Sequence, residues 1–287
     1  MTLKENVVGV QHLGIPVWDL EGARHWYEEV LGFETAYQKQ VFYPVRFDVV
    51  FLQQHDLTVE LCCPPAHTHR ALRERGHGVM AHYAMDAPDF AACAKRVAAR
   101  GAALDVSTPD GCVLYEHIGP KGVRGINFVG PSNEVIELCH DYAEDYLGKT
   151  GLQGWSHLAL KVADLSKTTD FYARLGFQKT ADGYLDTPDG RLWIAFLTIR
   201  GFSLEVIQVL PGEAEQLRRE PVGHLDHLAL EVLDAGDALS ACRRGRIPLV
   251  DQVVKRLPLF AHGVKCFTAL GPDGERIEFC EMCKNNY

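Results

Sequence analysis

The chain has 287 residues, 47% of them hydrophobic, and a formal net charge of −9, a length and composition that suit about two globular domains. The acidic balance argues against nucleic acid or an anionic membrane surface as the main partner, because both need concentrated Lys and Arg. With no apolar run near the ~18 residues that span a bilayer, no room for a signal peptide before the first strand, and nine cysteines outside any disulfide framework, we expect a cytoplasmic protein with reduced thiols.

The first predicted unit opens with an apolar strand that carries His12. A helix is expected over residues 20–31, with Asp19 as its N-cap and Gly32 as its stop signal. The last predicted strand of the unit places Glu60 inside an otherwise apolar run. Three strands are expected after the helix, at 34–41, 46–53 and 57–62, so the unit is predicted to be βαβββ.

A second unit follows a basic linker at 66–76. Its first strand carries His82, its helix is expected over 89–100, and Glu137 lies in its final strand. Strand patterns cover 103–106, 112–118, 125–129 and 134–139.

The second half of the chain repeats the first after a polar, Gly-bearing linker at 141–151. The third unit has a strand with His157, a helix expected over 165–175 and a strand with Glu205. The fourth unit begins with the strand of His227 and ends with the strand of Glu278. Strands of the third unit are expected at 177–185, 192–199 and 202–209.

The spacing of the histidines shows that this is a tandem repeat. Seventy residues separate His12 from His82 and His157 from His227, and 145 residues separate the corresponding positions of the two halves. We therefore predict an α+β protein of four βαβββ units, with a first domain at 1–142 and a second at 153–287.

Two histidines and two glutamates recur in each half at matching positions. A lone histidine or glutamate in a strand is usually a core or surface residue, but eight ionisable groups at repeated positions need a shared explanation. Two imidazole nitrogens and two carboxylate oxygens suit Zn, Ni, Co, Mn or Fe as a divalent ion, and four protein ligands leave room for substrate. The predicted metal ligands are His12, Glu60, His82 and Glu137 in the first half and His157, Glu205, His227 and Glu278 in the second. Duplication alone would also preserve the spacing, so one ion or two per chain stays open.

The chain resembles the vicinal oxygen chelate superfamily, which includes glyoxalase I, methylmalonyl-CoA epimerase, extradiol dioxygenases and bleomycin-resistance proteins. The resemblance rests on the histidine strands, on helices that end in Leu-Gly-Phe at Gly32 and Gly176, and on the Gly-Pro-Asp-Gly sequence that precedes Glu278. It implies that two units pair into a cup of eight strands with a metal on its floor. One cup is thus expected from residues 7–142 and another from 153–283.

The His-Glu-His-Glu set resembles glyoxalase I and related isomerases or epimerases. The resemblance implies a metal-dependent lyase, isomerase or epimerase that moves a proton next to a carbonyl through a metal-bound enediolate. Glu137 and Glu278 are then the catalytic bases, and Glu60 and Glu205 the opposite carboxylates.

Two alternatives stay open, an iron-dependent extradiol-type dioxygenase and a non-catalytic resistance protein that binds a small molecule. Extradiol enzymes carry a tyrosine ten residues before the final glutamate, where this chain has Asn127 and Thr268, and resistance proteins generally lack the metal ligands. The expected partner is a small oxygenated carbonyl compound, with no nucleic acid or membrane, and the protein is expected to be a monomer or homodimer.

Two further pairs lie 145 residues apart, His117 with His262 and Tyr115 with Phe260. They either line the pockets or belong to the inherited core packing.

Overall fold

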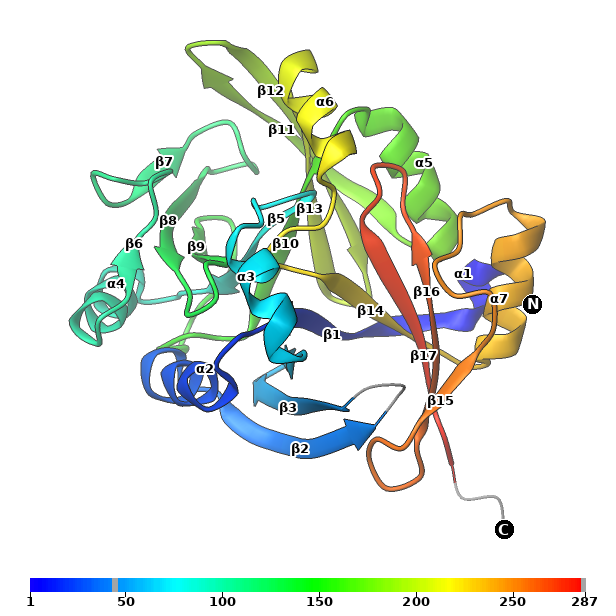
Figure 1. Ribbon diagram of the computed structural model, residues 1–287. Helices are drawn as coiled ribbons and strands as arrows, with labels where there is room; N and C mark the ends of the chain where they lie inside the picture. The colour runs from blue at the N-terminus through cyan, green and yellow to red at the C-terminus, as the bar shows by residue number, and fades with distance from the viewer. Residues whose placement is uncertain (43–45, 285–287) are drawn as a thin grey trace.

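The structure, a computed structural model, describes residues 1–42 and 46–284. Four successive units of strands and helices build two mixed β-sheets (Figure 1). The predicted α+β class is confirmed. The last three residues of the predicted 153–287 domain lie outside the described residues. No helix in the described parts of the chain is long and apolar enough to cross a membrane.

The first unit follows the prediction closely, with local differences at its helix. Asp19 caps the helix by accepting a hydrogen bond from the backbone N–H of Gly22, and Gly32 ends it with φ of 77°. Its second part is a π-helix, and a short helix that the sequence did not predict precedes β1. The elements are α1 (Leu3–Asn6), β1 (Val7–Pro16), α2 (Leu20–Trp26), η1 (Tyr27–Leu31), β2 (Glu34–Phe42), β3 (Arg46–Gln54) and β4 (Leu57–Cys63).

The second unit has shorter outer strands than the sequence predicted, and the linker before it is partly helical. The linker holds η2 (Ala66–Thr68) and α3 (His69–Arg73). The unit itself comprises β5 (Met80–Asp86), α4 (Phe90–Ala99), β6 (Ala103–Leu104), β7 (Val113–Tyr115), β8 (Val123–Val129) and β9 (Val135–Asp141).

The third and fourth units repeat this order, with one additional helix between them. The third comprises β10 (Trp155–Val162), α5 (Leu165–Leu175), β11 (Gln178–Thr187), β12 (Gly190–Ile199) and β13 (Phe202–Gln208), followed by α6 (Pro211–Arg219). The fourth comprises β14 (His227–Val232), α7 (Ala235–Arg244), β15 (Lys255–Leu257), β16 (Val264–Leu270) and β17 (Arg276–Met282).

Each sheet takes one unit from each half of the chain. In the first sheet the strand order is β15-β16-β17-β14-β1-β4-β3-β2, so the first unit pairs with the fourth. In the second sheet the order is β11-β12-β13-β10-β5-β9-β8-β6, with β7 on β8, so the second unit pairs with the third. The expectation of one cup from 7–142 and another from 153–283 is therefore wrong. The physical reason is that every unit offers the same open strand edge, so the repeat alone does not determine which units join.

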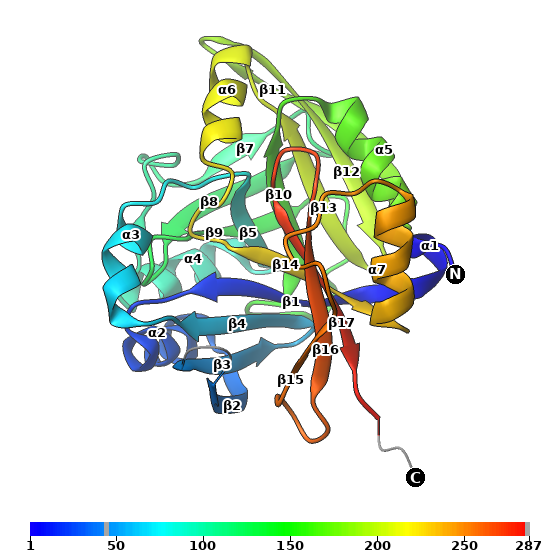
Figure 2. The same ribbon diagram turned by 45° about the vertical axis from the view of Figure 1, so that its right-hand side comes forward.

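Helices α2, α4, α5 and α7 pack against strands of the two sheets (Figure 2). Successive side chains of a strand point to opposite faces, and in β1 this places Leu13 and Ile15 in the main hydrophobic core. His12 and Gly14 therefore face the other side. The same alternation orients the ligand-type residues of all four units toward the concave faces.

A buried carboxyl group fixes the final hairpin of the second and fourth units. Glu134 accepts hydrogen bonds from the hydroxyl of Tyr27 at 2.6 Å and from the backbone N–H of Ser132 at 2.8 Å. Glu275 accepts them from the hydroxyl of Tyr172 at 3.1 Å and from the N–H of Asp273 at 3.0 Å. Burial raises the pKa of both carboxyl groups to about 7, against the hydrogen bonds that lower it.

The raised pKa values of Glu134 and Glu275 predict how the free energy of unfolding depends on pH. Between their unfolded pKa of about 4.5 and about 7, the unfolded chain releases protons that the folded protein keeps, so the free energy of unfolding falls as pH rises. The slope is about 1.4 kcal/mol per pH unit for each group. Glu134→Gln with Glu275→Gln is expected to flatten this decline in urea unfolding at pH 5, 6 and 7. The exposed Glu116→Gln is the control; an unchanged slope in the double variant would contradict the prediction.

Candidate metal centres

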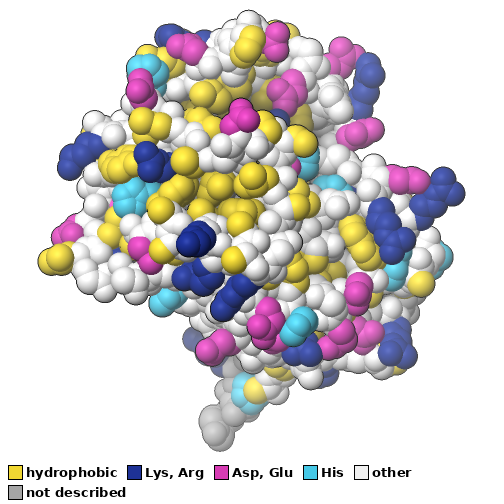
Figure 3. Space-filling model, turned by 90° about the vertical axis from the view of Figure 1, so that its left-hand side faces the viewer, with side chains coloured by type: hydrophobic (Ala, Val, Ile, Leu, Met, Phe, Trp, Pro, Cys, Tyr) yellow, Lys and Arg dark blue, Asp and Glu magenta, His cyan; other side chains and the backbone are white. Residues whose placement is uncertain are grey.

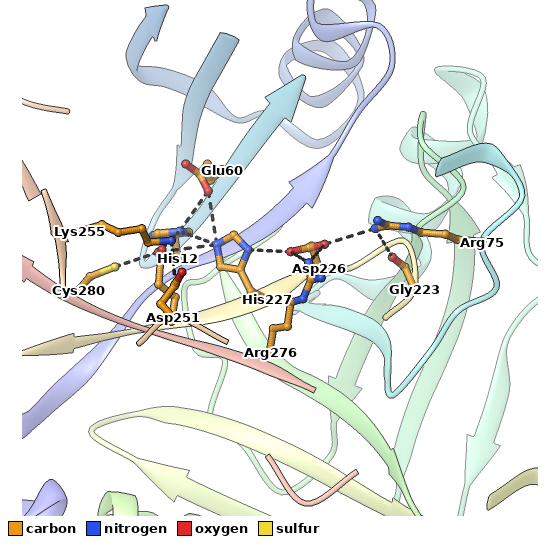
Figure 4. Close-up of polar contacts among 11 residues, drawn as sticks. His12, Glu60, Arg75, Gly223, Asp226, His227, Asp251, Lys255, Arg276 and Cys280 are labelled. Atoms are coloured by element: carbon orange, nitrogen blue, oxygen red, sulfur yellow. Dashed lines mark hydrogen bonds and ion pairs between the residues drawn. The ribbon is translucent and has the colours of Figure 1, made fainter. Parts of the chain in front are cut away.

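Four ligand-type side chains meet on the concave face of the first sheet, in a group that we call cluster A: His12, Glu60, His227 and Glu278. The Nε2 atoms of His12 and His227 lie 3.2 Å apart, and each lies 3.4 Å from Oε2 of Glu60. Oε2 of Glu278 lies 3.9 Å from both nitrogens. Figure 4 shows the two imidazoles turned toward one another with Glu60 above them.

The second sheet holds an equivalent group, cluster B: His82, Glu137, His157 and Glu205. The Nε2 atoms of His82 and His157 lie 3.2 Å apart. Oε2 of Glu137 lies 3.1 and 3.2 Å from these two nitrogens, and Oε2 of Glu205 lies 3.7 and 3.5 Å from them. All eight residues singled out in the sequence thus come together in two groups of four.

The structure combines the four histidines into pairs other than the predicted ones. The sequence suggested His12 with His82 and His157 with His227, but the structure joins His12 with His227 and His82 with His157. The cause is the strand pairing, since β1 lies antiparallel to β14 and β5 antiparallel to β10. Each candidate site therefore needs both halves of the chain.

The strand register explains how the side chains converge. In the first sheet Gly14 of β1 lies opposite His227 on one neighbouring strand and opposite Glu60 on the other. In the second sheet Ala159 of β10 is flanked in the same way by His82 and Glu205. A small residue between the two ligand-type residues lets their side chains lean over it and meet.

Gly14 leaves no space for a larger residue. A Cβ atom at this position would stand 2.0 Å from Cε1 of His227. Gly14→Ala is therefore expected to displace this imidazole and to weaken metal binding at cluster A by tenfold or more, measured by competition with a chelator. Gly9→Ala is the matched control on the same strand, because a Cβ there would meet nothing within 4 Å. Equal metal affinity in the two variants would show that His227 does not need this space.

The spacing of the donor atoms fits a divalent ion. Two atoms that each lie about 2.1 Å from a zinc-like ion are about 3.0 Å apart at a right angle and about 3.4 Å apart at a tetrahedral angle. The separations of 3.1–3.9 Å in the two clusters begin just above the right-angle value and include the tetrahedral value. The triads His12–Glu60–His227 and His82–His157–Glu205, each with two buried residues and one half-buried histidine, have donor atoms within 4.8 Å of one another.

The outer nitrogens of the imidazoles in cluster A are held by acceptors. Nδ1 of His12 lies 3.1 Å from Oε1 of Gln11, and Nδ1 of His227 lies 3.3 Å from Oδ2 of Asp226. Arg276 in turn donates to both oxygens of Asp226, at 2.9 and 3.0 Å (Figure 4). A proton on Nδ1 leaves the Nε2 lone pair free to bind a metal. The sequence did not point to Asp226, although its position next to a repeated histidine was a usable signal.

The charge balance of both clusters calls for a cation. Burial by itself lowers the pKa of a histidine, yet the surrounding acidic groups raise the pKa of His227 and His157 well above the usual value. Burial raises the pKa of Glu205, whereas hydrogen bonds from the two imidazoles overcome burial and lower the pKa of Glu137 to about 2. Two carboxyl groups beside two imidazoles, both of them buried in cluster B and one of them in cluster A, are thus suited to a divalent ion.

Each cluster lies in a cavity of its own. Cluster A lines a cavity of about 370 Å³, and cluster B lines one of about 730 Å³. The larger cavity has an apolar wall formed by Ile118, Leu185, Leu192, Ile194, Phe196 and Ile207. Hydrophobic side chains also gather in a hollowed region on the face of the molecule where β6–β9 lie (Figure 3).

The remaining residues singled out in the sequence fall into different places. Tyr115 lines the larger cavity and Phe260 the smaller one. His117 stacks on Tyr184 with ring centroids 4.3 Å apart, and neither His117 nor His262 is among the described residues that line the two cavities. Asn127 lies opposite Glu137 on the neighbouring strand of the second sheet, and Thr268 lies opposite Glu278 in the same way in the first sheet.

Comparison with known proteins supports the same architecture. Residues 9–137 and 154–279 match the family described as the Glyoxalase/Bleomycin resistance protein/Dioxygenase superfamily. The uncharacterized protein YwbC of Bacillus subtilis is 28% identical over 123 residues, which are 43% of this chain and 93% of that protein.

Two solved structures have a similar fold along nearly the whole chain. Glyoxalase I from Zea mays has a TM-score of 0.66 and 16% identity, covering 97% of this chain and 94% of that one. A putative dioxygenase from Bacillus subtilis has a TM-score of 0.61 and 12% identity, covering 96% of this chain and 85% of that one. At such identities the likeness shows the fold alone. With matches that extend over both halves, the chain belongs to the glyoxalase, bleomycin resistance and dioxygenase superfamily, as two tandem modules.

Proposed function

We propose that this protein is a metal-dependent lyase, isomerase or epimerase that moves a proton next to the carbonyl group of a small oxygenated compound. The observation that carries the proposal is the convergence of two histidines and two glutamates on the floor of each cavity. Donor sets of this kind suit catalysis, because four protein ligands on a six-coordinate ion leave two adjacent positions for the oxygens of a substrate.

All four side chains of each cluster are proposed to hold the ion. These are His12, Glu60, His227 and Glu278 in cluster A, and His82, Glu137, His157 and Glu205 in cluster B. A divalent ion here would act as a Lewis acid that favours loss of a proton beside a carbonyl group. Zn, Ni, Co, Mn and Fe all accept such ligands.

Glu137 and Glu278 are proposed to be the bases. Glu137 lies on β9, the last strand of the second unit, and Glu278 lies on β17, the last strand of the fourth unit. Each side chain lines the cavity of its own cluster. At neutral pH the carboxylate of Glu137 is ionised, which is the form that accepts a proton. The hydrogen bonds from His157 and His82 that lower its pKa to about 2 would be lost when these imidazoles bind an ion, which would make the carboxylate more basic. The carboxylate would take the proton from one carbon and return it to the neighbouring carbon, or to the opposite face of the same carbon.

Cluster B is the better candidate for a bulky substrate. Its cavity has about twice the volume of the cavity at cluster A, 730 against 370 Å³. In cluster A the thiol of Cys280 donates to Oε2 of Glu278 at 3.0 Å, which restrains the carboxylate that would act as the base there.

Two measurements test the proposal. Metal analysis of the purified protein is expected to give one or two divalent ions per chain, whereas a sequestering protein would lack a stoichiometric ion. Solvent deuterium is then expected to enter α-hydroxyketones, acyl-CoA thioesters or glutathione hemithioacetals in the presence of the protein. Oxygen uptake with catechols, together with stoichiometric iron and no exchange, would instead identify a ring-cleaving dioxygenase.

A further inference from the structure

A pair of cysteines lies at cluster A beside Glu278. Cys266 on β16 and Cys280 on β17 are directly opposite one another in this antiparallel strand pair, and both line the smaller cavity. Both are free thiols, and a hydrogen bond joins one to the other. Figure 4 shows the sulfur of Cys280 turned toward the imidazoles of the cluster.

The positions of the two residues suit a disulfide bond. Residues directly opposite one another in an antiparallel pair have Cα atoms about 4.5 or 5.5 Å apart, and disulfide bonds join Cα atoms about 4.4–6.8 Å apart. Cys266 and Cys280 can therefore be joined by turning their side chains, with both strands left in register.

The cavity gives a small oxidant access to the pair. Both cysteines are buried, so a reagent reaches them only through the space that they line. That space measures about 370 Å³, and a molecule the size of water occupies about 30 Å³. Hydrogen peroxide, which is little larger than water, therefore fits beside the sulfur atoms.

The second sheet has one cysteine where the first has two. The strand pair that corresponds to β16 and β17 places Gly125 opposite Cys139. A Cβ atom on Gly125 would stand 1.9 Å from Oε1 of Glu137, so the carboxylate of cluster B fills the space above the glycine. The dithiol is thus a property of cluster A rather than of the repeated unit.

One thiol of the pair also contacts a predicted metal ligand. Cys280 donates to Oε2 of Glu278 at 3.0 Å, and the same oxygen lies 3.9 Å from Nε2 of both His12 and His227. An ion that binds this oxygen must compete with the thiol for it, which lowers the affinity for the ion. A disulfide carries no S–H group and would end the competition.

We propose that Cys266 and Cys280 form a modification site that peroxide converts to a reversible disulfide, and that this bond releases Glu278 from Cys280. The oxidation state of the pair then adjusts how strongly cluster A holds a divalent ion, while cluster B is unaffected. The effect on the ion rests on the ligand set proposed above. The inference is independent of the proton-transfer reaction.

The oxidation balances with one peroxide for each disulfide. One sulfur attacks a peroxide oxygen, the O–O bond breaks, and a sulfenic acid and one water form. The second sulfur attacks the first, the S–S bond forms, and the hydroxyl group of the sulfenic acid leaves with the remaining thiol proton as a second water. Two thiols lose two electrons in all, and the peroxide gains them.

Peptide mapping tests the disulfide. The full chain with Cys283→Ser is treated with hydrogen peroxide, alkylated under denaturing conditions and digested with trypsin without a reductant. Peptides 266–276 and 277–284 are expected to appear joined and to separate after dithiothreitol. The Cys283→Ser change removes the other cysteine of the second peptide. Cys62→Ser is the matched control, because Cys62 lines the same cavity on β4, away from the pair.

Manganese(II) affinity tests the release of Glu278, because this ion prefers oxygen and nitrogen ligands to thiols. It is measured by competition with a chelator after peroxide is removed, in a Cys283→Ser and His82→Ala background that removes a ligand of cluster B. Oxidation is expected to tighten binding roughly threefold to tenfold, the value of one hydrogen bond.

Two single changes separate the disulfide from the lost hydrogen bond. Cys266→Ala keeps the thiol that donates to Glu278, so it is expected to show the affinity of the reduced protein before and after peroxide. Cys280→Ala lacks that donor and is expected to show the affinity of the oxidised protein in both conditions. In a His227→Ala background, where cluster B alone is complete, peroxide is expected to leave manganese affinity unchanged.

Separate, fully alkylated peptides after peroxide would overturn the modification site. A joined peptide with equal manganese affinity before and after oxidation, or no manganese binding in either state, would overturn the control of Glu278. Failure of the proposed function is a different result. Absence of deuterium exchange would remove the proton-transfer reaction and leave the disulfide and its effect on the ion standing.

Discussion

A protein with His12→Ala and His82→Ala is expected to lose both metal ions, whereas a protein with His12→Ala and His227→Ala is expected to keep one. The first double variant changes two residues of one half of the chain but removes one ligand from each cluster, because strand pairing joins each half to the other. The second double variant removes two ligands from cluster A and none from cluster B. Metal content per chain after exhaustive dialysis, with wild-type protein loaded to two ions, distinguishes the variants.

The opposite pattern would mean that each half forms a site of its own. In that case the change of His12 and His82 would leave one ion, in the second half, and the change of His12 and His227 would leave none. Thermal unfolding with and without added zinc is the control for folding, since an ion that binds only the folded state raises its stability in proportion to the logarithm of concentration.

Glu137→Gln is expected to reduce proton exchange at cluster B by roughly a hundredfold to ten-thousandfold, the usual contribution of a positioned base. The amide keeps the shape of the side chain but does not accept a proton at neutral pH. His82, His157 and Glu205 remain as a triad whose donor atoms lie within 4.8 Å of one another, so the ion is expected to stay bound.

The measurement is deuterium incorporation into the compound that exchanges with the parent protein in the screen above, with metal content determined on the same samples. Glu278→Gln is the matched control, because it changes the corresponding carboxylate of cluster A and leaves cluster B intact. Full exchange by Glu137→Gln in a His227→Ala background, which removes a ligand of cluster A, with the ion of cluster B in place would remove Glu137 as the base.

Local structure and candidate ligands could be predicted from the sequence because each depends on short-range patterns. Asp19 and Gly32 mark the ends of the first helical segment through capping and a left-handed backbone conformation, and both are read directly from residue type. The spacings of 70 and 145 residues likewise indicated His12 and its three counterparts as candidate ligands. The π-helix at Tyr27–Leu31 has no comparable signature.

The pairing of the units and the differences between the clusters could not be predicted. A spacing of 145 residues is equally compatible with pairing inside a half and pairing between halves, because the edges of β1 and β10 are alike. The surroundings of Asn127 beside cluster B depend on Ser107 and Asp105, which lie in a loop and are joined to it by hydrogen bonds that only the folded chain brings together. Roles as ligand or base remain predictions for all eight residues.

The first unit pairs with the fourth and the second with the third, so the two inner units can complete their sheet before the two outer units during synthesis. The inner pair has all its strands once Gln208 has left the ribosome, so the sheet of cluster B can close early. The edge of β1 must wait for β14, which ends at Val232, and the sheet of cluster A is complete only with β17, which ends at Met282. The nascent chain therefore carries an exposed segment for most of translation, which makes its N-terminal unit the part most dependent on chaperones.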